Sequence, residues 1–261
     1  MQAWDSNKNL FNDYLSLFQK LNICSISTDQ LLRFDQIHAG GLTATKKISE
    51  LINLKPSSKV LELGGGIGGV ARYLAKNYNS FVINLDLSLT YSITGLKLTS
   101  MTKEQLMVFF VCSDALDIPF GDEKFNLVWM QHINMNIFEK GKLLKEIKRV
   151  LKKEGALVFH EWFIKKEGTE IYYPLPWSDS EKFSFLTTFE NFINLAESIG
   201  FKGSFIKDDT EFSLNFYKKI YENRAFLNPV FKERDAPTIF ENIIRLIEEN
   251  KLSCIYGKLV F

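Results

Sequence analysis

The sequence predicts an α/β fold, in which a parallel sheet is covered by helices on both faces. Two observations carry this prediction. From residue 59 onward, short apolar runs alternate with helical patterns, and a cluster of glycines follows the first apolar run. Strand–helix alternation of this kind builds a parallel sheet with helices on both faces. We therefore expect one α/β domain preceded by a helical extension, and not two domains.

Two helices are predicted before the alternating region. Residues 8–20 place apolar side chains at helical spacing, which predicts the first helix. Thr43 is a candidate cap for a second helix that runs to about Ile52. Pro56 cannot continue a helix, so we expect the second helix to end before it.

The remaining elements follow in order along the chain. Apolar runs predict strands over residues 59–63, 81–86, 107–111, 125–130 and 156–160. Helical patterns between these runs predict helices over residues 69–76, 90–103 and 138–151. The C-terminal third adds helices near residues 187–199, 212–225 and 237–249, and strands near residues 201–207 and 253–261.

Composition argues against several functional classes. The 32 Lys and Arg residues balance 31 Asp and Glu residues, so a net charge of +1 gives no electrostatic reason to expect a nucleic-acid partner. No apolar run approaches the roughly 18–20 residues of a membrane span, and the first residues do not resemble a signal peptide. Three scattered cysteines, Cys24, Cys112 and Cys254, favour a cytoplasmic protein. Neither they nor the three histidines have the spacing of a metal site, so we expect no metal.

The glycine cluster predicts a nucleotide-binding loop, because glycine lets a ligand approach the backbone at a helix N-terminus. Gly64, Gly66 and Gly69 fit the fingerprint of nicotinamide or flavin sites. Gly64, Gly66 and Gly68 fit the shorter-spaced loop that binds S-adenosylmethionine. Asp86 ends the next strand, where either ligand class uses an acidic residue for the ribose hydroxyls. The loop alone therefore leaves a dehydrogenase and a methyltransferase open.

Five segments decide between the two by their order. Residues 60–69, 84–86, 113–120, 125–129 and 145–155 resemble successive motifs of the class I S-adenosylmethionine-dependent methyltransferases. The resemblance covers roughly residues 40–260. It implies a Rossmann-like, three-layer αβα sandwich with a seven-stranded, mostly parallel sheet whose last strand is antiparallel. It assigns residues 46–261 to the methyltransferase domain and residues 1–45 to a helical lid.

A narrower resemblance rests on three segments, residues 35–45, 131–137 and 174–177. They are similar to small-molecule methyltransferases of the sarcosine/dimethylglycine branch and the related phosphoethanolamine enzymes. Some relatives carry Asp-Ala-x-x-His after the fourth strand, where this chain has Gln131-His132. The resemblance implies S-adenosylmethionine as methyl donor, S-adenosylhomocysteine as product and a small amine as acceptor. Methyl transfer to oxygen or carbon, and a non-catalytic protein that binds S-adenosylmethionine, stay open as alternatives.

The resemblance also implies three groups of site residues. The residues expected at the methyl donor are Glu62, Gly64, Gly66, Gly68, Asp86, Leu87, Asp114, Ala115 and Gln131, with Glu62 supporting the loop. Gln131 and His132 are the candidate catalytic pair, because ligands bind beyond the carboxyl ends of parallel strands. The candidate acceptor-binding residues are Arg33, Gln36, His38, Tyr173 and Trp177. Arg33 is a candidate partner for an acceptor carboxylate, whereas we expect Tyr14 and His160 to be mainly structural.

Overall fold

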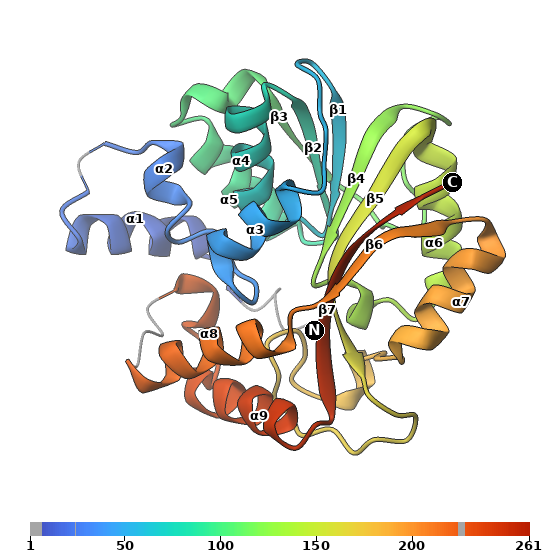
Figure 1. The fold of residues 1–261 in the computed structure, drawn as a ribbon. Coiled ribbons are helices and arrows are strands. Elements are labelled where there is room, and N and C mark those ends of the chain that lie inside the picture. The colour runs from blue at the N-terminus through green and yellow to red at the C-terminus, as the bar shows by residue number, and fades with distance from the viewer. Residues whose placement is uncertain (1–6, 24, 224–227) are drawn as a thin grey trace.

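The computed structural model describes residues 7–23, 25–223 and 228–261, so Cys24 and the first six residues lie outside the described part of the chain. Seven strands form one sheet in the order β3-β2-β1-β4-β5-β7-β6 (Figure 1). The strands are β1 (Lys59–Leu63), β2 (Phe81–Asp86), β3 (Val108–Cys112), β4 (Phe125–Gln131), β5 (Leu151–Ile164), β6 (Lys202–Asp208) and β7 (Leu252–Val260). Strands β1 to β5 pair in parallel, whereas β7 runs antiparallel between β5 and β6. The predicted α/β fold and sheet are thus confirmed.

The described chain also contains nine α-helices, besides short 3₁₀ turns. They are α1 (Leu10–Lys20), α2 (Thr28–Leu31), α3 (Gly41–Ser49), α4 (Gly69–Tyr78), α5 (Leu89–Thr99), α6 (Lys140–Val150), α7 (Phe189–Ile199), α8 (Thr210–Glu222) and α9 (Ala236–Glu248). Helices α3 and α4 pack on one face, and α6 and α7 pack on the other. Helices α8 and α9 lie together beyond the carboxyl end of β4 (Figure 1). Within the described residues, none of the helices combines the length and the apolar character that crossing a bilayer requires.

The central strands are buried on both faces, which explains their almost continuous apolar sequence. In β4, Leu127 and Trp129 pack toward α4, and Val128 and Met130 pack toward α6. Successive side chains of a strand point to opposite faces, so one short run supplies both cores. The polar residue Gln131 follows at the end of the same strand. The sheet therefore ends in polar groups at the edge where a ligand site is expected.

Local details differ from the sequence-based expectations. Gly40, with φ +77°, precedes the first turn of α3, so that helix begins before Thr43 and Thr43 is not its cap. The predicted helix over residues 90–103 divides into α5 and a 3₁₀ turn over Lys103–Leu106. Strand β5 extends past the predicted end at His160 to Ile164, because it pairs with β7 from Leu157 to Ile164. This pairing joins distant parts of the chain, so the sequence around residue 160 does not indicate where β5 ends.

Two ion pairs, one buried and one at the surface, connect the N-terminal extension to α4. The Arg72 guanidinium donates to Asp35 over 2.7 Å, and both side chains are almost fully buried. Lys76 pairs with Asp29 at the surface. Tyr14 is fully buried in α1, as expected of a core position, and its hydroxyl donates to the Phe34 carbonyl. Helix α3 runs across residue 45, and the division of the chain at that residue stays a prediction.

Candidate functional site

A cavity opens at the carboxyl ends of β1, β2 and β4, at the sheet edge predicted for the site. The predicted residues that line it are His38, Glu62, Gly64, Gly66, Asp86, Leu87, Asp114, Ala115, Gln131, His132 and Trp177. Gly68, Arg33, Gln36 and Tyr173 are not among the lining residues. The cavity therefore unites the glycine loop, the strand ends and the segment after β5, which lie far apart in the sequence.

The glycine loop meets the cavity at Gly66. This residue has φ +54°, and its N–H donates to Asp86 Oδ2 over 2.8 Å. A Cβ added to Gly66 would meet only the Tyr91 ring, at 3.7 Å, so the space beside it is open. Gly68 serves a different purpose, because a Cβ there would lie 2.6 Å from the Phe110 ring. Gly66 thus borders open space in the cavity, whereas Gly68 packs against β3 and precedes α4.

Glu62 lies beneath this loop and supports it. The side chain is 3% exposed, and Asn84 Nδ2 donates to Glu62 Oε2 over 3.1 Å. A Cβ on Gly65 would lie 2.6 Å from the Glu62 carboxyl carbon, so the loop rests directly on this group. Burial raises the pKa of Glu62 to about 8, with Asn84 opposing the rise. Glu62 thus contacts the loop, and its supporting role stays a prediction.

Asp86 and Asp114 each make a local turn contact and also border the cavity. Asp86 Oδ1 accepts from the Ser88 N–H over 2.8 Å, while Oδ2 accepts from Gly66. Asp114 is exposed, and its Oδ1 accepts from the Leu116 N–H over 2.8 Å. A carboxylate has about four acceptor positions, so such contacts are compatible with further bonds from a ligand's hydroxyl or amino groups.

Gln131 organises two histidines around the end of the cavity where the methyl acceptor is expected (the acceptor end). Trp129 Nε1 donates to Gln131 Oε1 over 3.0 Å, and an indole N–H can only donate. The amide NH₂ of Gln131 therefore faces His38 Nδ1 at 2.9 Å and His160 Nδ1 at 3.3 Å. Both Nδ1 atoms must accept, so both rings carry their proton on Nε2. Gln131 fixes these two tautomers, which is a positioning function that the sequence did not predict.

His132 follows directly after β4 and lies beside this network. Its backbone has φ +57°, and its N–H donates to the His160 carbonyl over 2.9 Å. The rings of His132 and His160 meet edge to face at 4.7 Å, and the His38 ring stacks on His132 at 6.0 Å. His132 Nε2 is buried and has no hydrogen-bond partner among the described residues. The structure thus leaves a ring nitrogen available at the predicted catalytic position.

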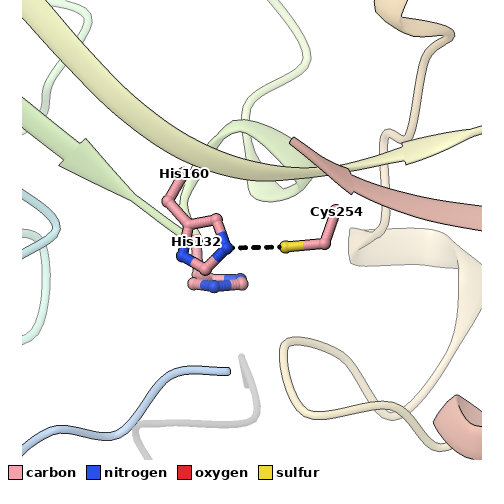
Figure 2. Close-up of side chains that lie close together, drawn as sticks. All are labelled: His132, His160 and Cys254. Carbon is pink, nitrogen blue, oxygen red and sulfur yellow. Dashed lines mark hydrogen bonds between the residues drawn. The ribbon is translucent and has the colours of Figure 1, made fainter. Parts of the chain in front are cut away.

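His160 in β5, Cys254 in β7 and His132 just after β4 converge, although their sequence spacing gave no sign of it (Figure 2). One potential ligand atom from each lies within 4.8 Å of the others. His160 Nε2 is 2.9 Å from Cys254 Sγ, a hydrogen-bonding separation. Metal binding by His160 Nε2 would move the proton to Nδ1, where the Gln131 NH₂ already donates. The hydrogen-bond pattern therefore fits a thiol–imidazole contact better than a metal centre.

Burial keeps the three histidines neutral. It lowers the pKa of His38 to about 4 and that of His160 to about 3. The pKa of His132 falls well below 6.5, first through burial and then through the neighbouring His160 and His38. A neutral His132 can accept a hydrogen bond at physiological pH.

Aromatic side chains form the walls of the acceptor end. Trp162 stacks on Trp177 with ring centroids 6.3 Å apart, and Tyr217 lies 6.1 Å from Trp162. Trp162 and Tyr217 were not predicted, because β5 and α8 meet only in the folded chain. Trp162 had one available signal, since it stands two residues after His160 and thus on the same face of β5.

The positively charged residue that lines the cavity differs from the predicted Arg33. Arg33 is exposed and lies outside the cavity lining, whereas Arg234 lines the cavity. The Arg234 guanidinium donates to the Leu175 and Pro176 carbonyls and to Asp179. Arg234 therefore fastens the segment that carries Trp177. Gln36 and His38 belong to one hydrogen-bonded group. Tyr173 is half-buried and does not line the cavity.

Comparisons with known proteins agree with this arrangement. Residues 61–159 match the family model described as a methyltransferase domain. The glycine/sarcosine/dimethylglycine N-methyltransferase of Actinopolyspora halophila is 28% identical over 114 residues, which make up 44% of this chain but only 20% of that protein. The phosphoethanolamine N-methyltransferase of Plasmodium falciparum is 24% identical over 223 residues and 82% of each chain. The chain thus spans a fifth of the first relative and most of the second.

A solved structure shows the same fold. Phosphoethanolamine N-methyltransferase 2 of Haemonchus contortus, in complex with phosphomonomethylethanolamine and S-adenosylhomocysteine, superposes with a TM-score of 0.71. The identity is 20%, and the match covers 87% of this chain and 54% of that one. The family model, the sheet order and the position of the loop agree, and residues 61–159 of this chain are similar to a methyltransferase domain.

Proposed function

We propose that this protein transfers the methyl group of S-adenosylmethionine to a small molecule, and that the acceptor atom is an amine nitrogen. One observation carries the proposal. The glycine loop and Asp86 border the same cavity as His132 and the tryptophan walls. A donor bound along the loop would therefore present its methyl group to the acceptor end.

The lining residues suit the donor. Gly66 leaves room for a ligand to approach the backbone. Asp86 is the candidate partner of the ribose hydroxyls, and Asp114, with the Ala115 backbone, is the candidate partner of the adenine. Carboxylates also favour a cationic sulfonium electrostatically. The nicotinamide alternative has no comparable support among the matched relatives.

The chemistry asks for alignment and exclusion of water. The bound donor supplies an electrophilic methyl group on a sulfonium. The acceptor's lone pair forms the new N–C bond while the C–S bond breaks and its electron pair stays on sulfur. The nitrogen, now positively charged, releases its N–H proton to water. The buried position of His132 Nε2 suits a group that orients the acceptor's N–H before attack.

The aromatic walls favour an acceptor that gains positive charge. Trp162, Trp177 and Tyr217 line the cavity on its acceptor side. Contact between an aromatic face and a cation contributes about 0.5–2 kcal/mol, depending on desolvation. Because charge develops on nitrogen during transfer, these faces stabilise the transition state more than the neutral amine. The N-methyltransferase names of the two reported relatives support the same acceptor atom.

The donor assignment is tested by calorimetric binding of S-adenosylhomocysteine and NADH. Wild-type protein should bind S-adenosylhomocysteine, and at about 100 times its dissociation constant the ligand adds about 2.7 kcal/mol of stability. Gly66→Val should abolish binding, because the new side chain fills the ligand's space. Gly168→Val is the matched control, since Gly168 also has a positive φ, +74°, but nothing within 4 Å of an added Cβ.

Binding of NADH without S-adenosylhomocysteine would contradict the proposal, and so would equal loss of binding in the two variants. The acceptor atom is tested by S-adenosylhomocysteine release with amine, phenol and carboxylic acid acceptors. Turnover confined to oxygen or carbon acceptors would refute the amine assignment.

We also propose a cytoplasmic location, on the basis of cysteine usage.

A further inference from the structure

A buried carboxylate lies behind the turn that follows β4. The Glu161 side chain comes from β5 and is fully buried. Its Oε1 accepts from the Ile133 N–H over 3.2 Å, and its Oε2 accepts from the Asn134 N–H over 3.0 Å. Removing a carboxylate from water is costly, but it brings two acceptor oxygens, whereas a glutamine side chain has only one. The carboxylate therefore matches two successive backbone donors.

These two bonds lie directly beside His132. The His132 backbone has φ +57°, a left-handed conformation that is uncommon for residues other than glycine. Its own N–H donates to the His160 carbonyl over 2.9 Å, so three successive N–H groups bind to β5. An uncommon backbone conformation persists where the surrounding structure holds it at several points. Glu161 and the His160 carbonyl together supply these points.

The same turn also contacts the two ends of the cavity. A Cβ added to Gly64 would lie 2.0 Å from Ile133 Cγ2, so the Ile133 side chain packs directly on the glycine loop. The Asn136 side chain donates to the Trp177 carbonyl over 3.1 Å. The position of the turn therefore determines how His132 lies between the donor loop and the aromatic walls.

We propose that Glu161 is a positioning residue for methyl transfer, which sets the direction of the His132 ring by holding the two N–H groups that follow it. This inference rests on the proposed function, because that function places His132 at the methyl acceptor. Glu161 is not among the residues that line the cavity. It thus acts through His132 and contacts neither the donor nor the acceptor.

The first test follows the imidazole rings by NMR, which is practical because the chain has only three histidines. The rings of His132 and His160 have centroids 4.7 Å apart, so their protons should show a nuclear Overhauser effect in the wild type. Glu161→Gln removes one acceptor oxygen, so the His132 ring should turn and this signal should weaken at least about 2-fold. Glu146→Gln is the matched control, because Glu146 also accepts a backbone N–H, that of Ile118, but does not line the cavity.

The spectra are recorded at about pH 9, where a carboxyl group with a pKa of about 8 is mostly ionised. Burial raises the pKa of Glu161 to that value, and the Ile133 and Asn134 N–H groups oppose the rise because they favour the ionised form. The ionised carboxylate is the form that accepts from both N–H groups.

The second test separates positioning from a purely structural role. With any acceptor that the S-adenosylhomocysteine release assay identifies, Glu161→Gln should lower kcat about 10-fold. In a His132→Asn background, the same substitution should change kcat less than about 2-fold, because the ring that Glu161 directs is already gone. Binding of S-adenosylhomocysteine within about 3-fold of wild type would show that the Glu161→Gln variant is folded.

Two results would overturn the inference. One is a contact between the His132 and His160 rings that is missing from the wild type, or that persists unchanged in Glu161→Gln. The other is an equal loss of kcat from Glu161→Gln whether His132 is present or replaced.

The wild type decides the question if Glu161→Gln does not fold. The amide protons of Ile133 and Asn134 should shift together with the Glu161 carboxyl carbon as that group titrates, and amide signals that do not follow it would refute the two bonds. Failure of the wild type to bind S-adenosylhomocysteine would instead refute the proposed function. The NMR results on Glu161 do not depend on turnover, so the two failures are distinguishable.

Discussion

At the scale of single residues, His132 is the side chain whose surroundings fit a catalytic position best. It has positive φ, a buried unpartnered Nε2 and two histidine neighbours whose tautomers Gln131 fixes. The ring nitrogens of His38 and His160 already make hydrogen bonds, whereas His132 Nε2 has no partner among the described residues. Its lowered pKa means that it acts mainly as a hydrogen-bond acceptor and not as a strong base.

His132→Asn should therefore lower kcat at least about 10-fold, within the range of positioned polar groups. Asparagine tolerates positive φ, so the backbone at this position is preserved. The affinity for S-adenosylhomocysteine, measured by calorimetry, should change less than about 2-fold. A parallel loss of donor affinity and melting temperature would identify His132 as a structural residue instead.

Residues with a local sequence signal were predictable, and those without one were not. Gly66 and Asp86 follow successive strands at recognisable spacing, so their place at the cavity follows from strand order. Tyr217 and Arg234 reach the cavity from C-terminal elements, whose position depends on how the folded chain packs. Arg33 is a cation within the predicted lid, and its charge favoured it as a partner for an acceptor carboxylate. The charge of a residue does not determine which way its side chain points, and the Arg33 side chain is exposed.

At the scale of elements, two ion pairs join the N-terminal extension to α4 and differ mainly in burial. Asp35 and Arg72 are almost completely removed from water, and Arg72 also donates to the Ile67 carbonyl in the glycine loop. Asp29 and Lys76 remain largely in solvent. Breaking a buried pair leaves an uncompensated charge, whereas an exposed pair contributes little.

Asp35→Asn should thus lower the free energy of unfolding by about 3 kcal/mol, and Asp29→Asn by less than about 1 kcal/mol. Urea unfolding of both variants checks this difference. Donor affinity should fall in Asp35→Asn as well, since Arg72 holds the loop carbonyl of Ile67. Equal stabilities of the two variants would show that the extension is not anchored through Arg72.

Element types were predictable from periodicity, while several boundaries were not. The alternation from residue 59 onward predicted the strands and helices along the chain, and its signal is clearest in β1 and β4, whose apolar runs are buried on both faces. The short helix α2 is too brief to show a period. The start of α3 depends on the positive φ of Gly40. A Cβ added at this position would also lie 2.4 Å from the Phe212 ring, so the packing there requires glycine. Such a tertiary contact cannot be deduced from the local sequence.

At the scale of the whole molecule, buried titratable groups should give stability a maximum near pH 6.5. His38, His132 and His160 have lowered pKa values, so the unfolded chain binds protons that the folded chain excludes, and stability rises with pH up to about 6.5. Glu62 and Glu161 have pKa values raised to about 8, so the folded chain holds protons that the unfolded chain has lost. Stability must then fall as pH rises from about 6.5 to 8.

Chemical unfolding across pH 5 to 8.5 measures this profile. Lys140, whose pKa burial lowers to about 8, partly offsets the decline, because its folded form releases a proton that the unfolded form keeps. We expect a net loss of about 1 kcal/mol between pH 7 and 8. Glu62→Gln should make that decline shallower. Stability that keeps rising through pH 8 would show that Glu62 and Glu161 are already ionised in the folded protein.

The place of β7 between β5 and β6 has a consequence for biosynthesis. In the described sheet β6 pairs with β7, so when β6 leaves the ribosome its strand partner has not yet been made. The nascent chain therefore exposes the far edge of β5 until residues 252–260 emerge. Cys254, which holds His160, arrives with the same strand. The acceptor end of the cavity is therefore completed only after residues 252–260 have been made, so a nascent chain that lacks them would carry a glycine loop without a finished place for the molecule to be methylated.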